Sequence, residues 1–582
     1  MVKFIRTRKR LNEEEENAKD YIALRDMKVF ARNDIPIVPV KSPTTLLTTH
    51  EVWSDFVKIS DLAVNNLGQD GNKKSYSFRA KEAPDGYVVA ETDVYCPSFD
   101  SKKAVILIGD YDNLPQQDVI DALVNKGFYV FTIDYNAIKP DTYTSFPNSL
   151  SYGIRGKEGD RIKEVCPTAK ETCQYLYTEI LRHLVYFIEE NFPNKEIIPV
   201  GIRSGTELAM ILAGTEKRRI AGVACLCGAG YPELSDVPKY TSNDYEPDYN
   251  TLAWMTGVSG VAYMRNFDKP VFIAIGTNAT LSDVDRLASF KSLLNGNLTL
   301  SITPHGADNI DRRSFDLFLS WLNCTYWKCD FPKAPKTTIE INRDGIVYAN
   351  ITACGEPEIK QTVLYYSYGD TNHKSRRWKM KLGETVGHAQ YLAKLIFTRP
   401  FEHLYYYTEI TYVNGMVVTE TPKYRNMGEY RLRLYPSKKG SILFMHEGET
   451  RFYEICDKPI ILSEGITEGV TPVGTKGSIF KEGSMRLFVA ENCKNIDTSR
   501  LLQVASFSSS KTYFLELSVT LRHSETIYKA SKKVVSSTTF ADTKFSVKDF
   551  KDEYFHPLTS WQDITSITIV NNNVVINKMI FI

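Results

Sequence analysis

The chain has 582 residues, of which 43% are hydrophobic and 24% charged, and its 71 Lys and Arg nearly balance its 70 Asp and Glu. At about 150 residues per domain, this length predicts three or four domains, each large enough to bury its own core. A net charge of +1 argues against a nucleic-acid-binding protein. No segment approaches about 18 apolar residues, so we expect no membrane-spanning helix and no membrane partner.

The cysteines and the first residues bear on location and metal binding. Ten Cys are scattered along the chain without paired CxxC motifs, and no apolar secretory signal is recognisable near Met1. We therefore expect reduced thiols, a cytoplasmic protein, no structural metal and no cofactor. Cys324 and Cys329 are the one pair that could meet across a turn.

Residues 1–80 mix charged residues with short apolar runs and predict an N-terminal extension packed on the following domain. The acidic run at 13–16 followed by Lys19 indicates a solvated helix face. Residues 52–64 read as strand or sheet-edge material leading into the body of the protein.

Residues 81–332 alternate strand and helix patterns, which predicts a mostly parallel sheet with helices on both faces. The predicted strands cover 87–95, 104–110, 128–135, 196–202, 220–228, 270–276 and 298–304. The predicted helices cover 116–127, 205–214, 283–296, 312–322 and a long segment that begins at the capping box Thr168 to Glu171. Residues 229–268 look like an insertion near the carboxyl ends of the strands.

After residue 332 the pattern becomes that of antiparallel β-structure. Residues 337–426 alternate apolar and polar side chains, and Asn414-Gly415 between two such runs is a strong hairpin signal. We predict a β-sandwich of immunoglobulin or fibronectin type here. Residues 427–582 are also rich in strand patterns, and their length suits a jelly-roll domain of the galactose-binding kind.

One motif in the predicted parallel sheet carries chemistry. The nucleophile elbow Gly-x-Ser-x-Gly places a serine on a sharp turn between a strand and a helix, with small residues two positions before and after it. Here Gly201 and Gly205 occupy the two small positions, between the strand 196–202 and the helix 205–214. The position of the nucleophile is Arg203.

With this motif, residues 81–332 resemble the α/β-hydrolases, in the branch of acetyl xylan esterases and cephalosporin C deacetylases. Residues 173–186 resemble the helix before the elbow, 276–286 the loop of the triad acid, and 303–308 the loop of the triad histidine. The resemblance implies that the catalytic serine maps onto Arg203, the acid onto Ala279, and the histidine onto His305, or onto Asp308 if the loop register shifts.

These replacements imply that acyl-transfer chemistry is lost. A guanidinium stays protonated and can act neither as nucleophile nor as base. If the protein is active, Ser204, Asp283 and His305 are the candidates. However, Ser204 would have Ile202 where the elbow needs a small residue, and Asp283 or Asp285 can be read simply as a carboxylate at a helix N-terminus. His305 is either a remnant catalytic residue or a solvent-bonded loop histidine.

The remnant pocket would consist of Arg203, Ser204, Asp110, Tyr111 and His305. A cation beside a helix N-terminus is a plausible site for a carboxylate or phosphate. Alternatively, Arg203 fills the pocket itself by pairing with an acid, either Asp110 or the carboxylates of the loops 283–285 and 303–308.

Two further segments have possible binding roles. The basic run 373–378 reads as an exposed turn, with an anion-binding or nucleic-acid-binding patch as the alternative. Tyr554, Phe555, His556 and Trp561 resemble the aromatic residues of carbohydrate-binding jelly rolls and could stack on sugar rings, but packing under a loop is the favoured interpretation.

The sequence thus favours an inactive hydrolase-like protein that binds a carbohydrate-related or anionic ligand or a protein partner. The alternatives are an active carbohydrate esterase or peptidase with displaced catalytic residues, and a purely structural assembly protein.

Overall fold

The computed structural model describes residues 44–165, 167–240, 246–306, 308–329, 331–354, 358–376, 378–397, 400–435, 442–445, 453–456, 466–480, 484–489, 496–521, 526–570 and 574–582. Residues 1–43 lie outside this part, and so does the predicted acidic helix face at 13–16. No helix of the described residues is long and apolar enough to cross a membrane.

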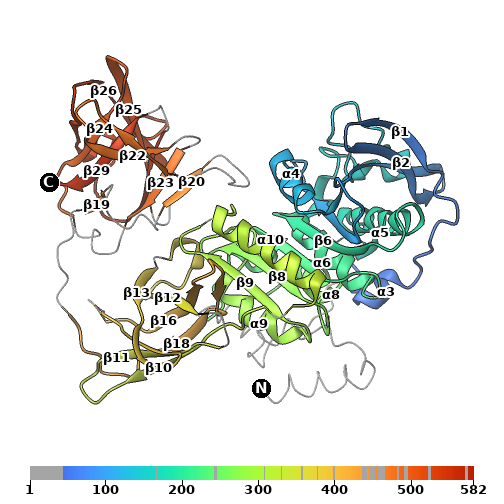
Figure 1. Ribbon diagram of the computed structural model, residues 1–582, viewed down its shortest axis with the longest axis horizontal. Helices are drawn as coiled ribbons and strands as arrows, with labels where there is room; N and C mark the ends of the chain where they lie inside the picture. Colours follow the sequence, from blue (N-terminus) through green and yellow to red (C-terminus); the bar gives the residue numbers. More distant parts are fainter. Residues whose placement is uncertain are drawn as a thin grey trace.

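A nine-stranded mixed sheet forms the first half of the described chain (Figure 1), in the order β1-β2-β3-β5-β4-β6-β7-β8-β9. Its strands are β1 (Asn65–Asp70), β2 (Lys73–Ala83), β3 (Gly86–Tyr95), β4 (Lys103–Ile108), β5 (Tyr129–Asp134), β6 (Glu196–Ile202), β7 (Val223–Leu226), β8 (Val271–Gly276) and β9 (Leu298–Thr303). From β5 to β9 neighbouring strands are parallel, whereas β1, β2 and β3 join antiparallel. The chain runs outward from β4 in both directions, so the β4–β6 boundary is the point where the strand order reverses.

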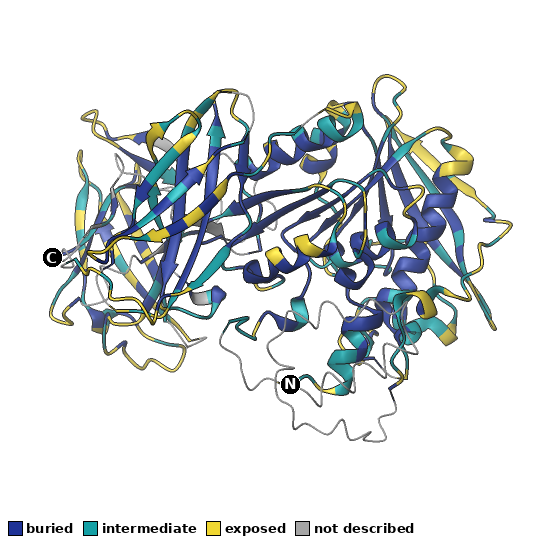
Figure 2. Cartoon of the chain, turned by 90° about the horizontal axis from the view of Figure 1, so that it is seen from below, coloured by how far each residue is buried: buried dark blue, intermediate teal, exposed yellow. Residues whose placement is uncertain are grey.

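Helices cover the faces of this sheet, as the alternating pattern predicts. They are α3 (Thr49–Trp53), α4 (Gln117–Asn125), α5 (Cys173–Asn191), α6 (Gly205–Thr215), α7 (Tyr249–Gly257), α8 (Gly260–Tyr263), α9 (Leu287–Leu293) and α10 (Arg312–Trp327). The central strands are dark blue over most of their length in Figure 2, because helices bury both of their faces. The helices α7 and α8 lie in the predicted insertion 229–268.

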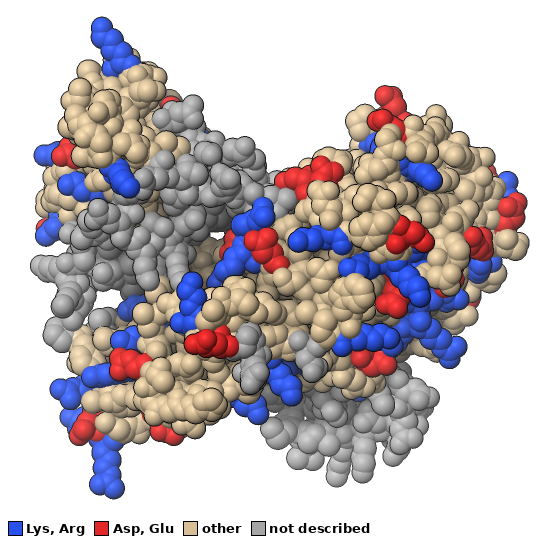
Figure 3. All heavy atoms as spheres, in the orientation of Figure 1, with Lys and Arg blue, Asp and Glu red and all other residues tan. Residues whose placement is uncertain are grey.

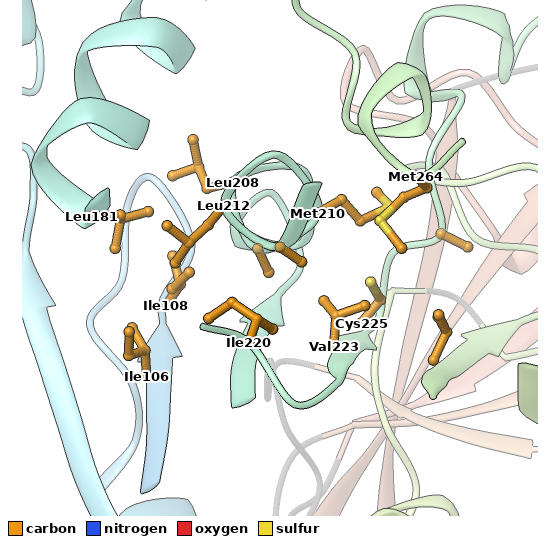
Figure 4. Close-up of a cluster of buried hydrophobic side chains, with 14 of the residues drawn as sticks. Ile106, Ile108, Leu181, Leu208, Met210, Leu212, Ile220, Val223, Cys225 and Met264 are labelled. Carbon is orange, nitrogen blue, oxygen red and sulfur yellow. The ribbon is translucent and has the colours of Figure 1, made fainter. Parts of the chain in front are cut away.

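Helix α6 packs its apolar side chains against the central strands and α5 (Figure 4). Leu208 and Leu212 lie between Leu181 of α5 and Ile108 of β4, while Met210 faces the β7 side. These side chains are 0% exposed. Helix α6 is apolar almost all round, which is typical of a helix packed on several sides.

Three local predictions require correction. Residues 52–64 form no strand, because Thr48 and Glu51 make a capping box that opens α3. The capping box from Thr168 opens only a short 3-10 turn, since Thr172 caps α5 by accepting from Tyr175 N. The predicted extension 1–80 does not stay outside the domain either, because β1 and most of β2 hydrogen-bond into its main sheet.

Two antiparallel sheets follow between 336 and 426. One contains β10 (Lys336–Ile341), β11 (Val347–Thr352), β15 (Gln390–Lys394) and β14 (Glu384–Gly387). The other contains β13 (Lys379–Leu382), β12 (Ile359–Tyr368), β16 (His403–Tyr412), β17 (Val417–Thr419) and β18 (Lys423–Asn426). The hairpin predicted at Asn414-Gly415 is confirmed: it joins β16 to β17, with Gly415 at φ 85°.

The last part of the chain also holds two antiparallel sheets around one core. The first contains β21 (Ile466–Val470), β22 (Lys476–Phe480), β29 (Val575–Phe581), β24 (Leu502–Phe507), β27 (Ala541–Phe545) and β19 (Ile442–Met445). The second contains β20 (Tyr453–Cys456), β23 (Ser484–Phe488), β28 (Ile564–Ile569), β25 (Thr512–Leu521) and β26 (Ile527–Val535). Trp561 is buried in this core and its indole N–H donates to Arg500 O, so it offers no exposed stacking face.

Candidate functional site

The turn between β6 and α6 has the geometry of a nucleophile elbow. Arg203 lies at its apex with φ 53°, a left-handed conformation that L residues rarely adopt. Its backbone N–H donates to Leu226 O over 2.8 Å, and its carbonyl accepts from the Thr206 hydroxyl over 2.7 Å. These bonds hold the strained residue in place.

The two small residues of the motif allow this turn to close. A Cβ on Gly201 would lie 2.3 Å from Gly205 O and 2.4 Å from Thr206 Cα. A Cβ on Gly205 would lie 2.4 Å from Gly109 O. Both separations are far inside van der Waals contact, so glycine is required at both positions by the neighbouring backbone.

Arg203 does not extend into an open pocket but pairs with Asp110, in the loop after β4. Its Nε donates to Asp110 Oδ2 over 2.8 Å, and its Nη1 donates to the carbonyl of Asp308 over 3.2 Å. The side chains of Arg203 and Asp110 are 28% and 14% exposed. The two residues therefore meet at the β4–β6 boundary, where ligands usually bind in open α/β sheets.

Asp110 also engages the groups that would form an oxyanion hole. In this fold the donors are the N–H after the nucleophile and one from the loop after the strand that corresponds to β4. Here Tyr111 N donates to Asp110 Oδ1 over 2.9 Å and to Ser204 Oγ over 3.0 Å. The Ser204 hydroxyl itself donates to Asp110 Oδ1. An internal carboxylate thus lies where a reacting oxyanion would be stabilised in an esterase.

The contacts of His305 differ from those of the elbow residues. His305 is 4% exposed, has φ 57°, and its Nε2 accepts from the backbone N–H of Trp378 over 2.7 Å. One ring nitrogen of His305 is thus engaged by the backbone of the following β-domain. The structure therefore brings Arg203, Ser204, Asp110 and Tyr111 together, and it places His305 at the boundary with the following β-domain.

The predicted acid candidates are held at the same boundary. The Asp283 carboxylate pairs with Arg286, and the Asp285 carboxylate receives both Nη atoms of Arg376 over 2.6 and 2.7 Å. At the position expected for the triad acid, the buried Ala279 contributes only its carbonyl, 3.1 Å from His373 Nε2. Asp308, the alternative to the histidine, accepts from the backbone N–H groups of the 280–281 turn.

The loop 370–378 of the β-domain makes most of these contacts, which corrects its predicted exposure. His373 and Arg376 are 3% and 0% exposed, and the Arg376 guanidinium lies 3.5 Å from the ring centroid of Tyr405. Asn278 clamps the loop, because its side-chain N–H groups reach three carbonyls of residues 373–376. The basic run is thus an interdomain contact: Arg376 pairs with Asp285, 91 residues earlier in the chain, and Lys374 pairs with Asp236, 138 residues earlier.

A continuous apolar core supports this contact. The main hydrophobic cluster of the nine-stranded sheet includes Val363, Tyr365, Trp378 and Tyr407 of the β-domain. Arg313 of α10 pairs with the buried Glu409 of β16 over 2.7 Å, and this carboxylate raises the pKa of the Arg313 guanidinium although burial opposes it. The buried pair and the shared core join the two domains.

Cavities and surface charge do not point to the elbow. A cavity of about 230 Å³ is lined by Lys73, Glu91, Asp93, Asp134 and Lys139, among others, but by neither Arg203 nor Ser204. Lys139 is paired with Glu91 and Asp93, so these charges are mutually satisfied. Basic and acidic side chains are interspersed on the face drawn in Figure 3. Within the described ranges, no three His, Cys, Asp or Glu side chains are grouped to hold a metal ion.

Comparisons with known proteins found solved structures of esterases that are similar to part of this chain. No protein-family model matches the sequence, and a search of curated proteins found no match. Acetyl xylan esterase 1 from Thermoanaerobacterium sp. JW/SL YS485 is 13% identical with a TM-score of 0.36, over 50% of this chain and 99% of that chain. Est1E from Butyrivibrio proteoclasticus, bound to ferulic acid, is 12% identical with a TM-score of 0.31, over 41% and 95%.

A thermostable carboxyl esterase from Bacillus coagulans is 13% identical with a TM-score of 0.31, over 44% of this chain and 99% of that chain. Likenesses at this level concern the fold alone. We base the α/β-hydrolase fold of residues 65–327 on the strand order and on the elbow at Arg203.

Proposed function

We propose that this protein is an α/β-hydrolase-fold scaffold that has lost ester hydrolysis and acts by binding a protein partner. The observation that carries the loss of ester hydrolysis is the Arg203–Asp110 pair at the elbow. An arginine at the apex cannot attack an acyl group, and an aspartate beside the Tyr111 N–H would repel a developing oxyanion.

The second domain supports the same proposal. In an active esterase the loops after β8 and β9 must present an acid and a histidine to the nucleophile. Here the buried loop 370–378 contacts both of these loops, and the Trp378 N–H engages the His305 ring. We take this sandwich to be of immunoglobulin or fibronectin type, the last domain to be a jelly roll, and the protein to be cytoplasmic.

The contacts of Asp110 argue against an anionic ligand at the elbow. The ligand's acidic group would have to displace Asp110 from both Arg203 and the Tyr111 N–H. Among the aromatic residues considered for carbohydrate stacking in the last domain, Trp561 is 2% exposed, whereas Tyr554 and Phe555 are 72% and 78% exposed.

An acetyl-ester assay tests the loss of activity. The full-length protein, Ser204→Ala and Arg203→Ser should hydrolyse 4-nitrophenyl acetate at the same background rate. Arg203→Ser should gain nothing, because Nε2 of His305, the candidate general base, already accepts the backbone N–H of Trp378, and general bases contribute about 100-fold or more. Ser320→Ala on α10 serves as a matched control. Wild-type turnover that disappears in Ser204→Ala would instead establish the active-esterase alternative.

A further inference from the structure

The C-terminal end of α10 brings two cysteines together. Lys328 adopts a left-handed conformation with φ 53° just after the helix. Cys329 N–H donates to Cys324 O over 3.0 Å, and Lys328 N–H donates to Thr325 O over 3.4 Å. This pair of bonds is a Schellman motif, in which the side chains at the positions of Cys324 and Cys329 usually contact each other.

The surroundings of the two thiols differ in a way that suits stepwise oxidation. Cys329 is the exposed one among the seven cysteines whose environment the structure describes, whereas Cys324 is half-buried. Burial and the neighbouring Cys329 thiol raise the pKa of Cys324 to about 11. The exposed thiol is therefore the one that an external oxidant meets, and the second thiol lies directly beside it.

We propose that Cys324 and Cys329 form a reversible disulfide that locks the end of α10, where the chain passes to the β-domains. The Cys329 thiolate attacks a low-molecular-weight disulfide and forms a mixed disulfide, releasing one thiolate. The Cys324 thiolate then attacks Sγ of Cys329, and the second thiolate leaves. Both cysteines are oxidised, the small disulfide is reduced to two thiols, and the two cysteine protons pass through solvent to these thiolates.

The backbone makes closure possible without movement of the helix. A disulfide requires neighbouring Cα atoms, and the 3.0 Å bond from Cys329 N to Cys324 O already holds the two residues side by side. The disulfide would form at the C-terminal end of α10 and involves none of the elbow residues. It therefore does not depend on the loss of esterase activity.

Oxidised glutathione and tryptic mapping test the proposal. The native full-length protein is incubated with oxidised glutathione, remaining thiols are alkylated, and the denatured protein is digested. Cleavage after Arg313, Lys328 and Lys333 separates the two cysteines, so an intramolecular disulfide joins peptides 314–328 and 329–333 and falls apart on reduction. We expect this linked pair as the main product in monomeric protein.

Variants make the outcome decisive. Cys324→Ser should stop at the mixed disulfide on Cys329, because the resolving thiol is missing, and Cys354→Ser should behave like the wild type. A mixed disulfide that persists on Cys329 in the wild type, a disulfide between two chains, or two thiols that stay free would overturn the proposal.

Discussion

Arg203 shows how a residue can keep the backbone of a catalytic turn while abolishing its chemistry. Its φ of 53° preserves the elbow, and its guanidinium is neutralised by Asp110 rather than by a ligand. Asp110 in turn engages the Tyr111 N–H and the Ser204 hydroxyl. One carboxylate thus accepts hydrogen bonds from three donors of the elbow.

The elbow could be predicted from the spacing of Gly201, Arg203 and Gly205, because only glycine allows the backbone to pack closely at the first and last of these positions. The partner of Arg203 could not, because Asp110, Asp283 and Asp308 were all available in the sequence. Only the three-dimensional position of the loop after β4 selects Asp110. The role of His305 was equally hidden, since its partner is a backbone N–H from Trp378.

Gly201→Ala should destabilise the hydrolase-like domain by about 1–3 kcal/mol, the usual cost of overpacking a core. The added Cβ would meet backbone atoms 2.3–2.6 Å away, and backbone cannot rotate aside as a side chain can. Urea unfolding followed by tryptophan fluorescence measures the change. Gly387→Ala is the matched control, because its Cβ would meet the movable end of Gln390 at 3.1 Å. Equal midpoints for the two variants would contradict the packing argument.

At the scale of elements, the alternation of strand and helix patterns predicted most of the nine-stranded sheet. The parallel strands were recognisable because they are apolar runs between helices. The antiparallel strands β1 and β2 were missed because β1 is polar and largely exposed, and β2 is rich in polar residues that are mostly half-buried. Conversely, a strand was predicted over residues 52–64, but residues 53–59 are held by contacts with α5 that the local sequence does not encode.

His183 of α5 is central to these contacts. Its Nε2 accepts from Ile59 N–H over 3.2 Å, its Nδ1 lies 2.9 Å from Glu179 O, and the Phe56 ring packs 5.3 Å away. The ring must therefore be neutral, with the proton on Nδ1. Burial lowers the pKa of His183 to about 4, well below its usual value of 6.5.

Acidification should consequently weaken the attachment of residues 53–59 to α5. Because the unfolded chain binds the proton at higher pH than the folded one, the stabilisation is present above pH 6.5 and is lost as the pH falls towards 4. The loss amounts to about 3 kcal/mol. His183→Gln should remove this part of the pH dependence, as measured by urea unfolding at several pH values, while the exposed His388→Gln should not. Parallel curves for wild type and His183→Gln would refute the assignment.

At the scale of the whole molecule, the loop 370–378 turns two domains into one unit. Its anchor is Arg376, fully buried between Asp285 of the hydrolase-like domain and the Tyr405 ring. Burial alone would raise the pKa of Asp285, but the Arg376 guanidinium outweighs it and the pKa is lowered. The interdomain boundary therefore depends on a charge pair that neither domain can satisfy alone.

Arg376→Met should cost about 3–5 kcal/mol at neutral pH, because it leaves the Asp285 carboxylate buried without its main partner. In the wild type the depressed pKa stabilises the fold above the unfolded-state value, and this contribution is lost only as the pH falls through the folded-state value. In Arg376→Met, the guanidinium no longer opposes the effect of burial, so the pKa of Asp285 is higher than in the wild type. The carboxylate therefore takes up a proton at higher pH, and the loss of stability caused by the substitution should shrink on acidification. Urea unfolding across pH measures both effects.

Two further variants separate the buried charge from simple loss of packing. Asp285→Asn combined with Arg376→Met should recover part of the lost stability, since no unpaired charge remains. Lys374→Met is the matched control on the same loop: its partner Asp236 has a side chain that is 85% exposed, and such pairs contribute at most about 1 kcal/mol. If the double variant is no more stable than Arg376→Met, packing of the long side chain against Tyr405, rather than the ion pair with Asp285, holds the domains together.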